Sequence, residues 1–487
     1  MIRKLSLNKK LLFVFLVSFT LFLPSLFTFY THDDFFHLKI SKVNTLTGFF
    51  NFFNFTQGPE GLGVYRPLTT QVFYFLGNSL FHLNPLPLHI ISFLTFFLVI
   101  FLVYKLVSMI TKNQTISLIS AFLYATSATH FGHLYYLATY QELGLALFFL
   151  LTVIFFVKFV YKGNIKYYFL SLITYILALL SKETAVVLPA ILILVYGFLK
   201  LRKEKHIPLK KFVFALSPFL ILLFIYLYFH FFLYGLAQGE SYIWDFSPRF
   251  INTLFWYGLW SFNLPETLVD FVGPGLRFNP NLFKFWSKDI IPIFFLFGGF
   301  VIFILSALAK ARRKMKKKDW QVFVFSFAWF VLTLIPVLFL PLHKFAFYLT
   351  LPLVGVVLAV SYLIEKAKVN RILKIILASV WIFLTLFTLR LTVETHWITQ
   401  GAKVARNAHL FFRDLDIGEK GKMFIEFYDT KEDEDLPWGP SDLVKVVLSQ
   451  DNFFEVFFEE KFELLKEGSR TPEQDIIKVR ARSLLNY

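Results

Sequence analysis

The chain has 487 residues, of which 57% are hydrophobic, 20% are aromatic and only 17% are charged. Soluble domains carry about 25% charged residues, and apolar runs of about 20 residues recur along this chain, which excludes a soluble protein and predicts a polytopic helical membrane protein. The formal net charge of +17 does not indicate nucleic-acid binding, because the basic residues cluster in short loops between apolar runs. In such loops they orient the helices and meet lipid head groups. The chain has no cysteine, so disulfides, thiolate metal sites and a thiol nucleophile are excluded.

In chain order, the apolar runs predict about eleven membrane spans. The first follows a basic N-terminus, as in a signal peptide, but it has no small-residue cleavage site and is interpreted as an uncleaved span. The stretch 65–83 is less apolar and ends in Asn84-Pro85, so we predict a juxtamembrane helix there. The predicted spans are 11–29, 88–109, 115–129, 143–159, 167–180, 185–199, 212–234, 290–308, 322–340, 346–364 and 372–389.

Charge in the loops predicts the orientation of these spans. With the N-terminus in the cytoplasm, every dense Lys/Arg loop falls on the cytoplasmic side, as the positive-inside rule requires. The long loop 235–289, rich in Trp and Pro, then lies outside, and we predict an interfacial helix near 248–262. If 65–83 were a full crossing, the strongest basic loops would face outward instead.

After residue 390 the hydropathy falls, which predicts a second domain. We expect helices over 394–415 and 442–448 and strands over 423–428 and 453–458. The predicted fold is therefore an all-α polytopic membrane domain, residues 1–390, followed by a small α/β extracytoplasmic domain, residues 391–487.

The polar residues that follow the first span are the first candidates for chemistry. Asp33 and Asp34 lie where that span emerges into water, and adjacent carboxylates suit a general base, a metal ligand, or one of each. Carboxylates at a membrane boundary are functional candidates by default. The alternative is a solvated helix cap.

Further polar groups end later apolar runs on the same predicted side of the membrane. Arg66 suits a phosphate or an interfacial anchor. A pair of histidines spaced i, i+3 suits hydrogen bonds to a sugar or phosphate, and a metal less well, because no thiolate ligand exists. A purely structural role for each group is the alternative. The other members of this set are His130, His133, Lys182, Glu183, His343 and Lys344.

The order of these motifs resembles that of the GT-C glycosyltransferases over residues 10–390. The likeness is to the transmembrane and tetratricopeptide-repeat O-mannosyltransferases and their prokaryotic relatives, and more distantly to protein O-mannosyltransferases and aminoarabinose transferases. The motifs that carry it are His32-Asp33-Asp34, Tyr65-Arg66-Pro67-Leu68, Asn84-Pro85 with His89, His130-x-x-His133, Ser181-Lys182-Glu183-Thr184 and the Tyr348-Leu349-Thr350-Leu351-Pro352 run.

The resemblance implies an enzyme that takes a sugar, a mannose-like hexose, from a polyprenyl-phosphate carrier to a hydroxyl on the outer face. It implies Asp33 as the general base with Asp34 beside it, and Arg66 near the donor phosphate or the acidic pair. His130, His133, Lys182, Glu183, His343, Lys344 and Tyr348 are the remaining predicted substrate-binding residues. The implied acceptors are protein Ser/Thr or an envelope glycan or lipid, and the implied location is a prokaryotic plasma membrane.

This sequence departs from the family in two ways. The family's arginine before its Tyr-Leu-x-Leu-Pro motif is replaced by Phe347, and Lys344, three residues earlier, is our candidate substitute. The tetratricopeptide array is absent, so the acceptor of the eukaryotic relatives does not carry over.

These features favour an inverting single displacement without a cofactor or metal. Two other classes stay open, a transporter or flippase of lipid-linked sugars and a non-catalytic scaffold. A divalent cation gathered by His32, Asp33, Asp34 and His37 also stays open. The predicted partners are the lipid-linked donor, the acceptor and membrane lipid, with no nucleic acid.

Overall fold

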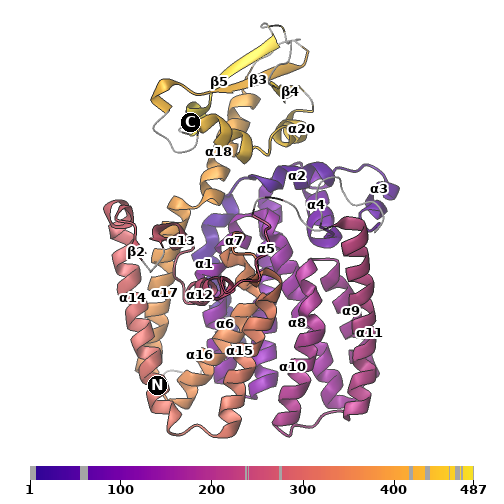
Figure 1. The fold of residues 1–487 in the computed structure, drawn as a ribbon, viewed down its shortest axis with the longest axis vertical. Coiled ribbons are helices and arrows are strands. Elements are labelled where there is room, and N and C mark those ends of the chain that lie inside the picture. Colours follow the sequence, from indigo (N-terminus) through magenta and orange to yellow (C-terminus); the bar gives the residue numbers. More distant parts are fainter. Residues whose placement is uncertain are drawn as a thin grey trace.

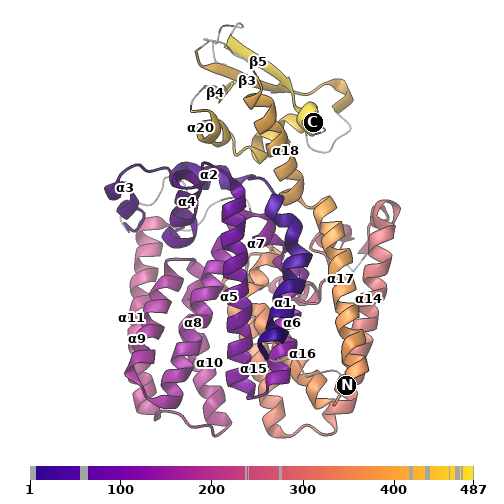
Figure 2. The same cartoon turned by 180° about the vertical axis from the view of Figure 1, so that it is seen from behind.

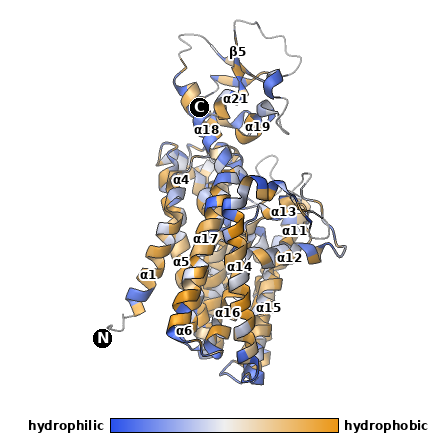
Figure 3. Cartoon of the chain, turned by 90° about the vertical axis from the view of Figure 1, so that its left-hand side faces the viewer, coloured by the Kyte–Doolittle hydropathy of each residue, from blue (hydrophilic) through white to orange (hydrophobic). Residues whose placement is uncertain are grey.

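The computed structural model describes residues 7–54, 64–235, 239, 241–273, 277–415, 421–433, 439–459, 461–466, 472 and 475–485. A bundle of long, roughly parallel helices carries a small α/β domain at one end, and the first described residues lie toward the other end (Figures 1 and 2). Hydrophobic residues cover the bundle and hydrophilic residues gather toward its ends (Figure 3). The predicted polytopic membrane fold with a small α/β domain is confirmed.

Within the described ranges, eight helices are long and apolar enough to cross a membrane. Three shorter helices, α6, α9 and α16, pack against their neighbours in the same bundle. All eleven predicted spans are therefore helical. The bundle consists of α1 (Leu7–Phe22, continued by η1, Leu23–Phe27), α5 (Pro85–Thr111), α6 (Gln114–Ala125), α8 (Tyr140–Lys162), α9 (Ile165–Leu179), α10 (Leu188–Leu201), α11 (Leu209–Phe229), α14 (Asn281–Arg312), α15 (Lys317–Leu338), α16 (Pro352–Lys366) and α17 (Arg371–Thr395).

Local sequence explains where several of these helices begin. Backbone groups in lipid must be hydrogen-bonded within the segment, which favours helices over the apolar runs. The side chains of Asn84, Asn113, Asn164 and Asn370 accept backbone N–H groups at the starts of α5, α6, α9 and α17. These caps satisfy donors that have no partner inside the helix.

Short elements join the long helices, and α2, α3 and α4 among them lie at the end of the bundle that carries the α/β domain (Figure 1). The stretch predicted as a juxtamembrane helix is helical only over 67–79, as η2 and α4, and the predicted interfacial helix is α12. These elements are α2 (Asp33–Ile40), α3 (Leu46–Asn51), η2 (Pro67–Val72), α4 (Phe73–Ser79), η3 (Ala128–His130), α7 (Phe131–Tyr135), η4 (Leu137–Thr139), η5 (Glu183–Val187), η6 (His230–Tyr234), α12 (Phe250–Trp260), α13 (Leu268–Phe271), β1 (Val272–Gly273), β2 (Arg277–Phe278) and η8 (Ala346–Thr350).

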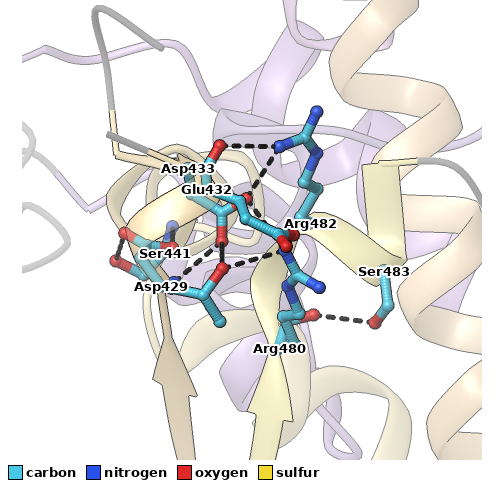
Figure 4. A network of polar contacts seen from close by, with 8 residues as sticks. Asp429, Glu432, Asp433, Ser441, Arg480, Arg482 and Ser483 are labelled. Carbon is cyan, nitrogen blue, oxygen red and sulfur yellow. Dashed lines mark hydrogen bonds and ion pairs between the residues drawn. The ribbon is translucent and has the colours of Figure 1, made fainter. Parts of the chain in front are cut away.

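The C-terminal domain is built on a three-stranded parallel sheet in the order β4-β3-β5. Ion pairs join its parts, because the buried Asp433 of η9 accepts hydrogen bonds from the partly exposed Arg480, at the end of β5, and Arg482 of α21 (Figure 4). Its elements are α18 (Trp397–Arg413), β3 (Met423–Tyr428), η9 (Lys431–Asp433), α19 (Pro440–Val447), α20 (Asn452–Phe458), β4 (Phe462–Leu464), β5 (Ile476–Arg480) and α21 (Ala481–Leu485).

Two sequence predictions for this domain need correction. The predicted strand over 453–458 is helix α20, because Phe453, Phe454 and Val456 are all buried, and this spacing fits one face of a helix but not strand alternation. The predicted helix over 394–415 is split at His396, whose backbone is extended between α17 and α18. The strand over 423–428 and the helix near 442–448 are confirmed as β3 and α19.

Helices α15 and α16 approach each other closely at Gly355. A methyl group at this position would lie 2.4 Å from the carbonyl oxygen of Ser326, a backbone atom that cannot turn away. We therefore expect Gly355→Ala to lower the free energy of unfolding by about 1–3 kcal/mol, a typical cost of overpacking. Thermal unfolding in detergent measures the effect. Gly298→Ala on α14 is the matched control, since an added methyl there meets no atom of the described residues within 4 Å. Equal losses in both variants would contradict the close approach.

Candidate active site

The two adjacent aspartates at the start of α2 have different surroundings. The Asp34 side chain is buried, and its carboxylate accepts hydrogen bonds from the Tyr74 hydroxyl and, over 2.8 Å, from the Thr31 backbone N–H. Asp33 is exposed, and its backbone N–H donates to the Tyr136 hydroxyl at 3.1 Å. Asp34 therefore holds the turn, whereas Asp33 is exposed.

Burial raises the pKa of Asp34 from 3.8 to about 7. The hydrogen bonds from Tyr74 and Thr31 oppose this rise, and the neighbouring charge of Asp33 adds to it. Asp34 thus titrates near neutral pH.

The residue before this pair has an unusual backbone. His32 has φ of 49° and ψ of −120°, a conformation that favours glycine. A non-glycine residue held there costs about 1–3 kcal/mol and persists only where surrounding structure enforces it. Such strain often occurs at functional sites.

Arg66 precedes η2 and binds a carboxylate on the loop after α9. Its Nε donates to Oε2 of Glu183 at 2.7 Å, one terminal nitrogen donates to the other Glu183 oxygen, and the second donates to the Gln141 side chain. This bidentate geometry fixes the guanidinium plane. The described contacts pair Arg66 with Glu183 and not with the Asp33–Asp34 pair, and its predicted place near the donor phosphate stays a prediction.

A second ion pair lies beside the first. Lys182 donates to Glu142, and the two side chains are only 2% and 5% exposed. The Lys182 ammonium also lies 4.7 Å from the centre of the Tyr348 ring. Burial lowers the pKa of Lys182, and Glu142 opposes that change. The four charged residues Arg66, Glu142, Lys182 and Glu183 are hereafter called the ion-pair cluster.

The prediction missed two members of this region, Gln141 and Glu142. They occupy the first turn of α8, inside a long apolar run. A carboxamide and a carboxylate at the start of a membrane span are the signal that would have identified them.

Three members of the ion-pair cluster, Arg66, Lys182 and Glu183, line a cavity of about 330 Å³ between α11 and α15. Arg66, Lys182, Glu183, Tyr242 and Tyr348 give the cavity its polar end. The rest of its wall is largely apolar and consists of Val64, Val186, Val187, Leu227, Phe231, Trp244, Phe246, Ile335, Pro336, Val337, Phe339 and Leu340, with Thr184, Tyr226 and His230 among them. A cavity of this kind suits an amphiphile with an anionic head.

The pKa of His343 depends both on charged residues that line this cavity and on Asp33. Its ring lies 4.1 Å from that of Tyr242, and its Nδ1 lies 3.2 Å from the Ser241 hydroxyl. Burial, together with the charges of Lys182 and Arg66, lowers the pKa of His343 to about 4, and the Asp33 carboxylate opposes that change. The predicted residues from the first loop, the Lys182 loop and the His343 loop therefore converge on one region.

His130 and His133 lie deeper in the protein. Both are buried, the Nδ1 of His130 lies 2.8 Å from the Nε2 of His133, and the other nitrogen of His130 lies 2.7 Å from the carbonyl oxygen of Tyr124. Burial lowers the pKa of both imidazoles. These contacts give the two histidines a packing role, and their predicted substrate contacts stay a prediction.

Lys344 lines a different cavity of about 690 Å³, together with Asp245, Arg249 and Trp256. Burial lowers its pKa, and the nearby charge of Asp270 opposes that change. The structure thus does not bring Lys344 to the ion-pair cluster, where it would replace the arginine missing at Phe347.

Among the described residues, no three His, Asp or Glu side chains come together closely enough to hold a metal ion. The divalent-cation alternative at His32, Asp33, Asp34 and His37 therefore has no ligand cluster in the described part of the chain.

The raised pKa of Asp34 predicts a pH-dependent stability. Because the folded protein binds this proton more tightly than the unfolded chain, the stabilisation is complete below pH 3.8 and is lost as the pH rises through about 7. A pKa that differs by one between the folded and unfolded states changes the free energy of unfolding by about 1.4 kcal/mol. Melting temperatures from pH 4 to 8 should therefore fall more steeply for the wild type than for Asp34→Asn, which cannot ionise. Parallel curves would contradict the raised pKa.

Residues 65–229, about a third of the chain, match the family model described as dolichyl-phosphate-mannose-protein mannosyltransferase. The matched segment includes all four residues of the ion-pair cluster and ends in α11, whereas Asp33 and Tyr348 lie outside it. No curated protein matches the chain. Over residues 65–229 the chain is therefore similar to a family of membrane mannosyltransferases, and its polytopic helical fold agrees with that similarity.

Proposed function

We propose that the protein is an inverting glycosyltransferase that moves a mannose-like hexose from a polyprenyl-phosphate carrier to a hydroxyl acceptor. The acceptor is a protein Ser/Thr or an envelope glycan or lipid, and transfer takes place on the outer face of a prokaryotic plasma membrane. The cavity between α11 and α15 carries this proposal, because its polar end and apolar wall match the two halves of such a carrier.

The apolar part of the cavity suits the polyprenyl chain. Its wall includes residues of α11, of its continuation η6 and of α15, and two of them, Phe231 of η6 and Ile335 of α15, are 54% and 40% exposed. Exposed apolar side chains on a membrane-spanning bundle face lipid. In this arrangement the tail lies along the bundle surface while the phosphate enters the polar end.

The ion-pair cluster suits the phosphate. Cleavage of the sugar–phosphate bond leaves one more negative charge on the phosphate, and Arg66 and Lys182 are held in place to meet it. A preorganised donor of this kind is worth about 2.7–4 kcal/mol in the transition state. The Arg66 side chain is 14% exposed against 2% for that of Lys182, so the phosphate has readier access to Arg66 than to Lys182.

Asp33 suits the general base. Its side chain is exposed, whereas that of Asp34 is buried and engaged with Tyr74. In the proposed step the acceptor oxygen loses its proton to Asp33 and forms a bond to the anomeric carbon. The bond from that carbon to the phosphate oxygen breaks, and its electron pair leaves with the polyprenyl phosphate. This leaving group is weakly basic, so the step needs no general acid.

A transporter of lipid-linked sugars is less well supported. Transporters place charged groups or broken helices near the membrane midplane. Here Glu142 lies in the first turn of α8, and Glu183 begins η5 ahead of α10. The buried charges thus lie at helix ends, which suits chemistry on one side of the membrane.

The role of Asp33 predicts a large loss of transfer in Asp33→Asn. General-base catalysis contributes about 10²- to 10⁴-fold, so turnover from radiolabelled polyprenyl-phosphate sugars should fall by that factor while donor binding persists. Asp442→Asn is the matched control. It is the same substitution at a side chain on α19 that is 77% exposed and that the proposed step does not use. Equal transfer by the wild type and Asp33→Asn would remove Asp33 from catalysis and move the base to Asp34 or Glu183.

The phosphate site predicts weaker donor binding in Arg66→Gln. Hydrogen bonds to charged groups contribute about 1.5–3 kcal/mol, so the Kd for the lipid-linked donor should rise by about 10- to 100-fold. Lys344→Gln separates the two candidate phosphate sites, because Lys344 lines the other cavity. If Lys344→Gln weakens donor binding and Arg66→Gln does not, the phosphate lies in the cavity near Lys344.

A further inference from the structure

The C-terminal domain packs directly on the helix that begins with Asp33. The backbone N–H of His32 donates to the carbonyl oxygen of Val447, at the end of α19, over 2.8 Å. One turn along α2, the ring of Phe35 lies edge-on to that of Phe453 in α20, with centroids 5.2 Å apart. These contacts join α2 to two separate helices of the C-terminal domain.

Helix α18 packs tightly against His32 at Gly401. A methyl group at Gly401 would lie 2.5 Å from Cε1 of His32 and 2.6 Å from the hydroxyl of Thr31. That hydroxyl is itself 2.7 Å from the Nδ1 of His32. A side chain at position 401 would therefore press on the side chains of His32 and Thr31, the two residues before Asp33.

The first residue of α18 completes the contact. The ring of Trp397 lies 4.8 Å from that of His32 and 5.3 Å from that of Tyr136. The Tyr136 hydroxyl accepts the backbone N–H of Asp33. Trp397 thus bridges the residue before Asp33 and the side chain that holds its backbone.

These contacts hold His32 in its strained backbone conformation. His32 keeps a positive φ of 49°, which non-glycine residues rarely adopt, and the groups around it come from α18 and α19. The torsion angles of His32 set the position and orientation of Asp33, the first residue of α2. Because the peptide plane between His32 and Asp33 is rigid, a change in the His32 torsion angles rotates Asp33 with it.

We propose that the C-terminal domain positions Asp33, with Gly401, Trp397 and the Val447 carbonyl holding His32 in its left-handed conformation. Gly401 is thus a positioning residue that touches neither donor nor acceptor. This inference rests on the proposed function, because it assumes that Asp33 is the base. It assigns the domain a part in catalysis, beyond that of a passive appendage.

Gly401→Ala in the full-length protein tests the inference. We expect kcat to fall by at least about tenfold, since displacements of about 1 Å at a reacting group are costly, while the Kd for the lipid-linked donor changes less than about twofold. The matched control is Gly421→Ala in the same domain, where an added methyl meets no described atom within 4 Å.

A second variant distinguishes positioning from simple loss of stability. In a His32→Gly background the imidazole is absent, and the Thr31 hydroxyl, no longer tied to it, is free to turn away from position 401. His32→Gly alone should lower kcat by loosening the turn, and adding Gly401→Ala should lower it no further. A fold defect caused by Gly401→Ala would instead appear in both backgrounds.

The possible failures are separable. A wild-type protein that transfers no sugar overturns the proposed function and, with it, this inference. A wild type that transfers sugar, with Gly401→Ala unchanged in kcat, overturns the positioning role alone. If Gly401→Ala does not accumulate as folded protein, His32→Gly gives the decision, since wild-type kcat in that variant shows that the turn needs no clamp.

Discussion

The buried charges of the ion-pair cluster constrain how this bundle packs. A single charged side chain removed from water costs several kcal/mol, and the cost is met only when an opposite charge lies in good hydrogen-bonding geometry. Arg66 with Glu183 and Lys182 with Glu142 satisfy that condition pairwise. Each pair joins segments far apart in the chain, so forming them requires η2, α8 and the loop between α9 and η5 to meet at one place. For the fully buried pair of Lys182 and Glu142, losing one partner typically costs about 3–5 kcal/mol, because the other charge is left buried and unpaired.

The same constraint produces a polar end in an otherwise apolar wall. The segments held by the ion pairs border the cavity between α11 and α15, where polar and apolar linings adjoin. A lipid-linked sugar phosphate has the same two parts in the same order. The chemistry of the cluster and the lipid-facing surface of the bundle therefore support one ligand class together, although neither would do so alone.

The candidate base depends on a different set of contacts. Asp34 fixes the turn by accepting from Tyr74 and Thr31, and His32 is held by groups from the C-terminal domain. The exposed carboxylate of Asp33 thus belongs to a helix that the membrane bundle supports from below and the small domain supports from above (Figures 1 and 2). Both domains contribute to the geometry of the candidate site.

The sequence by itself determined the membrane class, the eleven helical segments and most of the candidate polar residues. Long apolar runs form helices in lipid, because every backbone polar group must be hydrogen-bonded within the segment. Charged residues at the ends of such runs are rare and therefore easily identified as candidates. It did not determine α20, because a short aromatic segment fits both strand and helix until burial of Phe453 and Phe454 is known. Tertiary structure alone decided the partners. Arg66 joins Glu183, Lys344 faces another cavity, the two aspartates differ in burial, and His32 is clamped from a distant domain. The reason is physical, since hydropathy and propensity act along the chain, whereas pairing of charges and filling of space depend on residues that only folding brings together.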